Sequence, residues 1–172
     1  VLAPLLSGHE ALLVGPGLGA AATTVELVEA LLAGGAPGSQ GLLFATTDLP
    51  PGPDLPPLVV DADGLNALAR LEGGPAALPP GSILTPHPGE MSRLTGLSTA
   101  AVNANRWDVA RRFAALWNQI VILKGAFTVI AHPGGRLAVS PFADAALATI
   151  EALARDRELR FKLTEPEDEL PA

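Results

Sequence analysis

The stretch ILTPHPGEMSRLTG, residues 83–96, joins an apolar strand to a helix through a short loop rich in proline and glycine. Two prolines flank His87, and Gly89 and Glu90 follow at once. Proline fixes the backbone angle φ, so this loop is stiffer than a generic linker. Pro88 suits the first turn of a helix, where its missing N–H costs nothing. The stretch therefore predicts one strand–loop–helix unit with a histidine held in the loop.

Similar units recur along the chain, which predicts an α/β domain with a largely parallel sheet. We expect strands at residues 11–14, 42–44 (a weak one), 58–60, 82–85 and 120–123, and a hairpin from 127–131 and 137–139. A helix should follow Gly19, with Thr23 and Glu26 at capping-box spacing, and Gly34 and Gly35 should end it. Residues 98–118 have the apolar spacing of one long helix, with Val102, Val109, Phe113, Leu116 and Trp117 on its buried face.

Composition restricts the possible classes of protein. The chain has 172 residues, of which 48% are hydrophobic, and this is enough for one domain with a real core. No apolar run reaches the ~18 residues that a membrane span needs, so no membrane partner is expected. The formal charge of −7 comes without a basic cluster, which argues against a nucleic-acid surface. The chain has no cysteine, which excludes disulfides and thiolate metal sites and is compatible with a cytoplasmic location.

Glycine-rich or polar loops follow four of the expected strands. They are GPGLG (15–19), DADGLN (61–66), TPHPGE (85–90) and LKGAFT (123–128). Ligands of open parallel sheets bind outside the carboxyl ends of the strands, so we expect these loops to share one edge and form the site.

The first two loops each have a plain structural alternative. GPGLG can bring backbone N–H groups close to a phosphate, but glycine also serves in tight turns, and its match to a dinucleotide fingerprint is weak. Asp61 and Asp63 are candidates for holding hydrated Mg²⁺ or orienting a hydroxyl. Asp63 could instead cap the following helix.

The other two loops carry the remaining candidate side chains. His87 is placed to hydrogen-bond a polar ligand, whereas Glu90 also suits the positive end of a helix on structural grounds alone. Lys124 is the only lysine before residue 162 and is a candidate phosphate partner, the alternative being an exposed lysine at a strand end. No second histidine or cysteine accompanies His87, so direct metal ligation is not expected there.

The chain resembles the ADP/ATP-dependent NAD(P)H-hydrate dehydratases of the ribokinase-like superfamily in the order and spacing of four motifs. They are VGPGLG, VVDADGLNALA, LTPHPGEMSRL and VILKGAFTVIA. The resemblance implies a three-layer α/β/α fold around a mainly parallel sheet. It also implies repair of hydrated NADH or NADPH: the hydrate's hydroxyl is phosphorylated with ADP or ATP and Mg²⁺, and phosphate is then eliminated. The implied partners are the hydrates themselves, a second copy of the chain in a homo-oligomer and, in many bacterial members, an upstream epimerase domain.

The resemblance assigns binding roles to individual residues. The implied hydrate-binding residues are Gly17, His87, Pro88, Gly89, Glu90, Met91, Ser92 and Arg93. The implied nucleotide-binding residues are Lys124, Gly125, Ala126, Phe127 and Thr128.

The chain is expected to depart from the family's pattern at both ends. The resemblance runs from about Ala11 to Thr149, within a partial ribokinase-like domain at residues 1–149, and the family's opening Gly-rich segment has no counterpart before it. Residues 150–172 read as a divergent charged helix and acidic tail. The family's Gly-x-Gly-Asp loop, which supplies the catalytic base, has no counterpart there, and no glycine follows Gly135. We therefore assign no catalytic residue and expect an inactive central piece of a dehydratase. A ribokinase-like small-molecule kinase and a non-catalytic nucleotide-binding or oligomer-forming protein are the alternatives.

Overall fold

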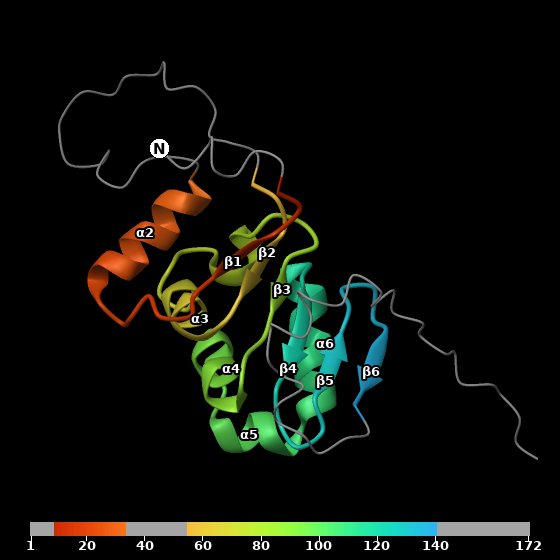
Figure 1. Ribbon diagram of the computed structural model, residues 1–172. Coiled ribbons are helices and arrows are strands. Elements are labelled where there is room, and N and C mark those ends of the chain that lie inside the picture. Colours follow the sequence, from red (N-terminus) through yellow and green to blue (C-terminus); the bar gives the residue numbers. More distant parts are fainter. Residues whose placement is uncertain (1–8, 34–54, 141–172) are drawn as a thin grey trace, which may run out of the picture.

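A computed structural model describes residues 9–33 and 55–140 as one mixed α/β sheet structure (Figure 1). The six strands follow one another in chain order across the sheet, as β1 (Leu12–Val14), β2 (Leu58–Val60), β3 (Ile83–Leu84), β4 (Ile120–Leu123), β5 (Val129–Ala131) and β6 (Leu137–Val139). Neighbours among β1 to β4 are parallel, and β4, β5 and β6 pair antiparallel. The predicted α/β class, the mainly parallel sheet and the hairpin are confirmed. The expected strand at 42–44, the helix stop at Gly34 and Gly35 and the segment 150–172 lie outside the described residues.

Helices connect the parallel strands and pack on one face of the sheet. They are α2 (Ala22–Leu32), α3 (Ala62–Leu68), the 3-10 helix η1 (Gly74–Ala77), α4 (Pro88–Thr95), α5 (Thr99–Ala104) and α6 (Arg106–Trp117). Each parallel strand is added on the same side of the one before it. Because crossovers between parallel strands are right-handed, this order places every connecting helix on the same face.

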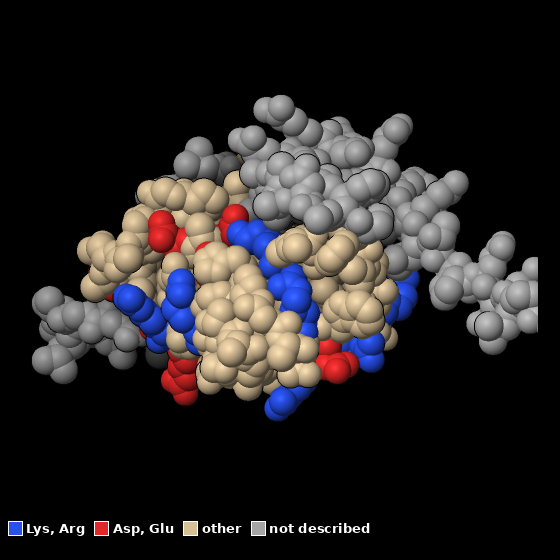
Figure 2. Space-filling model, turned by 90° about the horizontal axis from the view of Figure 1, so that it is seen from below, with Lys and Arg blue, Asp and Glu red and all other residues tan. Residues whose placement is uncertain are grey.

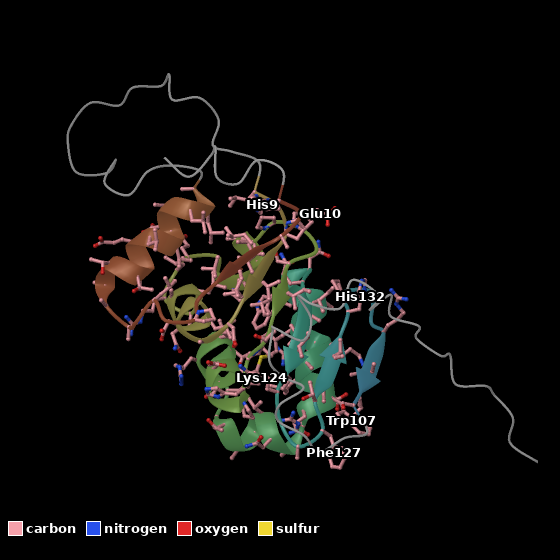
Figure 3. The ribbon with its side chains drawn as sticks, in the orientation of Figure 1. His9, Glu10, Trp107, Lys124, Phe127 and His132 are labelled. Carbon is pink, nitrogen blue, oxygen red and sulfur yellow. The ribbon has the colours of Figure 1, made fainter. Side chains whose placement is uncertain are left out.

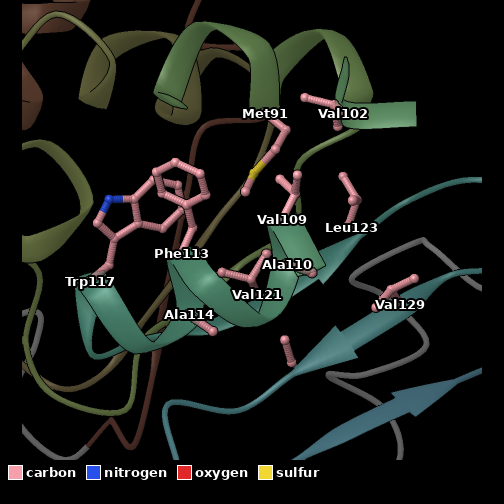
Figure 4. Close-up of a cluster of buried hydrophobic side chains, with 11 residues drawn as sticks. Met91, Val102, Val109, Ala110, Phe113, Ala114, Trp117, Val121, Leu123 and Val129 are labelled. Atoms are coloured by element: carbon pink, nitrogen blue, oxygen red, sulfur yellow. The ribbon is translucent and has the colours of Figure 1, made fainter. Parts of the chain in front are cut away.

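The buried core lies between these helices and that face of the sheet. Register aligns Val60 with Leu84 and Leu84 with Val121, so their side chains share one face, and all three are buried. One cluster joins α2 and α3 to β2 and β3, and a second joins α4, α5 and α6 to β4 and β5 (Figure 4). Leu94 packs against both clusters, so the core is continuous along the sheet.

The opposite face of the sheet is also apolar. Leu13, Val59, Ile83 and Ile120 are aligned across β1 to β4 and point away from the helices. No helix of the described ranges packs there, and Leu13 is 49% exposed. Two layers of the expected three-layer arrangement are thus present in the part of the chain that the structure describes. Within the same ranges, every helix is too short or too polar to cross a bilayer.

Two local expectations are wrong. The predicted helix at 98–118 is two helices, because Asn105 takes a non-helical backbone (φ −131°, ψ 41°) between α5 and α6. Its residue Leu116 is 65% exposed and not on the buried face. The predicted capping box of α2 is absent, because the helix begins at Ala22, two residues before the position that a Thr23 cap would give, and Thr23 lies inside it.

Candidate functional site

All four predicted loops meet at the edge where the parallel strands end. Gly19 N–H donates to Asp63 Oδ2 at 2.8 Å, which joins the first loop to the second. Lys124 Nζ lies 2.6 Å from Asp61 Oδ1 and 3.9 Å from Glu90 Oε2, which joins the fourth loop to the second and third. Figure 2 looks onto this edge, where basic side chains cross the middle of a largely uncharged surface and acidic side chains lie at separate places on it. The predicted convergence of the loops is confirmed.

The first two loops touch through their backbones. A Cβ on Gly15, which has φ +133°, would lie 1.8 Å from the carbonyl oxygen of Asp61. A Cβ on Gly64 would lie 2.8 Å from the carbonyl oxygen of Val14. Both glycines are therefore required for close packing of the first loop on the start of α3. Gly17, by contrast, is exposed and has open space around it, so its implied contact with a ligand is sterically free.

The two aspartates of the second loop face different neighbours. Asp61 pairs with Lys124, and Asp63 accepts from Gly19. Neither side chain caps α3, so the alternative role of Asp63 as a helix cap is wrong. Between them, Ala62 has φ 46°, a left-handed conformation that costs an L-residue about 1–2 kcal/mol. This turn lets the carboxylates of Asp61 and Asp63 reach two different loops.

His87 has a structural role that the sequence did not reveal. Its Nδ1 accepts from the N–H groups of Gly89, at 2.9 Å, and Glu90, at 3.3 Å, and so caps α4. Glu90 completes the capping box because its Oε2 accepts from His87 N–H at 2.8 Å. Pro88 occupies the first turn as predicted. The His87 side chain remains half-exposed, and its Nε2 lies 3.4 Å from Glu90 Oε1.

The rest of the implied hydrate-binding span divides between core and surface. Met91 is fully buried in the core. Ser92 Oγ donates to the carbonyl of Leu97 at 2.6 Å, inside the α4–α5 corner. Arg93 is on the site side, where its Nε donates to Asn66 Oδ1 at 2.8 Å and its guanidinium to the Gly89 carbonyl at 3.2 Å. Asn66, which no prediction singled out, thus ties the second loop to α4.

Lys124 is neither a freely exposed lysine nor an unpaired one. Its side chain is 19% exposed and sits between the carboxylates of Asp61 and Glu90. Its backbone N–H donates to the Pro86 carbonyl at 2.8 Å, which fixes the fourth loop against the third. Figure 3 shows Lys124 near the middle of this edge, with His9 and His132 away toward the other end of the sheet.

Arg106, at the start of α6, is the residue that sequence reasoning missed. Its guanidinium donates to the carbonyls of Leu123, Lys124 and Phe127 at 2.9, 3.1 and 3.2 Å. Burial lowers the pKa of Arg106, because desolvation disfavours its charge. The only sequence signal was its position at the break in an apparently continuous helix, and such a pattern does not reveal a contact with a distant loop.

A cavity of about 550 Å³ opens between α5, α6 and the fourth loop. Its lining residues are Pro88, Asn103, Arg106, Trp107, Gly125, Ala126, Phe127 and Val139. Trp107 and Phe127 are 58% and 53% exposed and lie at the lower edge in Figure 3. Within residues 9–33 and 55–140, no group of three or more His, Asp or Glu side chains is arranged to hold a metal ion.

Comparison with known proteins shows what these loops belong to. The family model described as NAD(P)H-hydrate dehydratase matches residues 2–149. The bifunctional NAD(P)H-hydrate repair enzyme Nnr of Moorella thermoacetica is 39% identical over 148 residues, which are 84% of this chain and 24% of that protein. The ADP-dependent (S)-NAD(P)H-hydrate dehydratase of Neisseria meningitidis is 39% identical over 99 residues, which are 54% of this chain and 32% of that protein.

A solved structure is similar to this chain and carries a name from the same family. The ADP/ATP-dependent NAD(P)H-hydrate dehydratase of Bacillus subtilis, co-crystallised with ATP/Mg²⁺, aligns with a TM-score of 0.56 and 29% identity. The alignment covers 81% of this chain and 42% of that one. A ribokinase-like protein of Enterococcus faecalis, at 20% identity and a TM-score of 0.60, supports the fold alone. The chain spans about a quarter to a third of the two curated relatives and under half of the solved chains. With a family match over most of its length and its four motif loops on one sheet edge, the chain belongs to the NAD(P)H-hydrate dehydratase family.

Proposed function

We propose that this chain forms the hydrate- and nucleotide-binding part of a dehydratase that restores hydrated NADH or NADPH to the reduced cofactor. The observation that carries the proposal is the position of Lys124. Its ammonium group joins the DADGLN, HPGE and LKGAF loops at the edge where ligands of parallel sheets bind. The same loops carry the family's motifs.

The two ligands would contact different loops at this edge of the sheet. The hydrate would lie against Gly17, the half-exposed side chain of His87 and Arg93, while the deeper residues of that span support the loop. The nucleotide would lie against Lys124 and the backbone of Gly125 to Thr128. The donor would be ADP or ATP, as in the names of the Neisseria and Bacillus proteins.

A hydrated Mg²⁺ ion fits the two aspartates. Asp61 and Asp63 each use one carboxylate oxygen on a protein partner, and their other oxygens accept from no residue in the described ranges. Mg²⁺ usually keeps several waters and binds through one or two carboxylates plus substrate phosphates. When bound, it would neutralise charge on the transferred phosphoryl group. Asp61 would in addition hold Lys124 in place beside that charge.

The remaining features of the protein follow as proposals from the same family membership. The working location is the cytoplasm, where nicotinamide cofactors are used. A homo-oligomer is the expected assembly, and an epimerase domain is expected upstream in the parent protein, in keeping with the bifunctional names of several relatives. Residues 150–172 lack the glycines of the family's catalytic loop, so the 172-residue chain should bind ligands without rapid turnover.

Binding therefore tests the proposal better than turnover does. Lys124→Ala should weaken ADP binding by about 1.5–3 kcal/mol, because it removes a charge-assisted phosphate contact, and should weaken hydrate binding less. Titration calorimetry with ADP and Mg²⁺, and separately with purified NADH hydrate, measures both affinities. Arg111→Ala, which removes an exposed cation from α6, is the control. Equal ADP affinity in wild type and Lys124→Ala would contradict the assignment.

A further inference from the structure

Arg106 hydrogen-bonds several backbone carbonyl groups of the fourth loop. One guanidinium nitrogen donates to the carbonyls of Leu123, Lys124 and Phe127. A fourth carbonyl, that of Gly125, accepts from the Thr128 hydroxyl at 3.4 Å. The carbonyls of this turn are therefore largely engaged within the protein, three of them by Arg106 at the start of α6.

The N–H groups of the same turn remain available. Those of Gly125, Ala126 and Phe127 donate to no acceptor among the residues that the structure describes. Successive backbone N–H groups at a turn form a concave site that attracts anions. The carbonyls, which would repel an anion, are the groups that Arg106 holds.

The fit between Arg106 and the loop is close. A Cβ on Gly125 would lie 2.6 Å from the guanidinium nitrogen of Arg106, and 2.8 Å from its central carbon. Arg106 makes no ion pair with a carboxylate in the described part of the chain, so its charge is balanced there by carbonyl dipoles alone. A role in packing alone would not require an unpaired charge at this position.

We propose that Arg106 is a positioning residue for the nucleotide: it holds the LKGAF carbonyls inward so that the N–H groups of Gly125, Ala126 and Phe127 face the phosphates beside Lys124. The proposal rests on the proposed function for the identity of the anion, a nucleoside diphosphate or triphosphate. Arginine suits this task because its planar fork spans several acceptors, whereas the ammonium of lysine is a compact point charge. Lysine at position 106 should therefore restore charge without restoring the loop.

The first experiment compares Arg106→Met and Arg106→Lys with Arg111→Met, a matched loss of an exposed arginine from the same helix. Both Arg106 variants should bind ADP about 10- to 100-fold more weakly, the range expected for loss of charge-assisted hydrogen bonds, with hydrate affinity close to that of wild type as evidence that the variants fold. Arg111→Met should bind both ligands as wild type does. Arg106→Met with wild-type ADP affinity would overturn the proposal.

A double-mutant cycle adds a readout that packing alone would not produce. Gly125→Ala should weaken ADP binding because the new methyl group displaces the guanidinium. In the Arg106→Met background that collision is relieved, so Gly125→Ala should then have a much smaller effect. Additive losses in the two backgrounds would show that Gly125 and Arg106 act independently, which contradicts the proposal.

Amide resonances separate this inference from the proposed function. In two-dimensional NMR spectra without ligand, Arg106→Met should shift the Gly125, Ala126 and Phe127 amides and speed their hydrogen exchange, and Arg111→Met should not. If the wild-type chain fails to bind ADP, the proposed function fails, and these spectra still test the role of Arg106. Unchanged loop amides in Arg106→Met would overturn that role whether or not ADP binds.

Discussion

The two imidazole nitrogens of His87 lie in different surroundings. Nδ1 accepts two backbone N–H groups at the start of α4, and Nε2 faces the half-exposed side near Glu90. An acceptor Nδ1 requires the neutral ring with its hydrogen on Nε2. Fold and ligand can therefore use opposite ends of one side chain.

Substitution can separate these two uses. His87→Ala should lower the free energy of unfolding by about 1 kcal/mol, the usual cost of removing a helix N-cap, and His87→Asn should recover most of it. Asparagine does not reproduce the Nε2 donor, so both variants should lose hydrate affinity. Chemical denaturation and hydrate titration measure the two effects. Hydrate affinity that returns along with stability in His87→Asn would confine His87 to the capping role.

Single residues also mark the limit of what the sequence could predict. The loop positions of Asp61, His87 and Lys124 followed from where apolar runs end. Their partners did not, because the pairing of Lys124 with Asp61 depends on register between strands far apart in the chain. Gly15 shows the same limit. Its close backbone approach to Asp61 is a consequence of tertiary packing, and the sequence alone could not distinguish this from a glycine required only for a turn.

At the level of elements, the break between α5 and α6 has the largest effect on the site. The apolar spacing across residues 98–118 continues through Asn105, so periodicity alone predicted one helix. Asn105 leaves the helical conformation, and α6 then begins at Arg106. The break places Arg106, the first residue of α6, within hydrogen-bond distance of the carbonyls of the fourth loop.

The other end of α6 permits a direct test of helix termination. Asn118 has φ 55° and ψ 38°, the left-handed conformation common where a helix stops. Asn118→Ala should lower the free energy of unfolding by about 1 kcal/mol, since alanine tolerates this conformation poorly, whereas Asn118→Gly should be neutral or slightly stabilising. Urea denaturation of both variants measures the difference. Equal stability of the two would mean that α6 ends differently in solution.

For the molecule as a whole, the two faces of the sheet differ in how much they should contribute to stability. Leu58 is 1% exposed beneath the helices, and Leu13 is 49% exposed on the opposite face. Leu58→Ala should cost about 2–5 kcal/mol, as expected for a buried leucine, and Leu13→Ala less than about 1 kcal/mol. Thermal unfolding of the two variants measures both. A larger loss for Leu13→Ala would indicate that a further part of the chain covers that face.

The α/β class, the strand positions and the shared edge of the loops were predictable because burial and turn residues leave local marks in the sequence. The side of the sheet on which the helices lie was not stated in advance, although it follows from strand order and right-handed crossovers. The helix break at Asn105 and the hydrogen bonds from Arg106 to the fourth loop could not be predicted from the sequence, since both depend on contacts between distant segments.

The strand order also bears on how the chain folds. The antiparallel part pairs near neighbours such as Ala131 with Leu137, whereas the parallel part must bring together residues as distant as Leu12 and Leu58. Closing long loops costs more entropy before any contact is gained, so local hairpins form first. We therefore expect the β4–β5–β6 unit, with α6 packed on it, to form the folding nucleus. The loop that Arg106 organises belongs to that nucleus, so the proposed phosphate site would take shape before the remainder of the sheet is assembled.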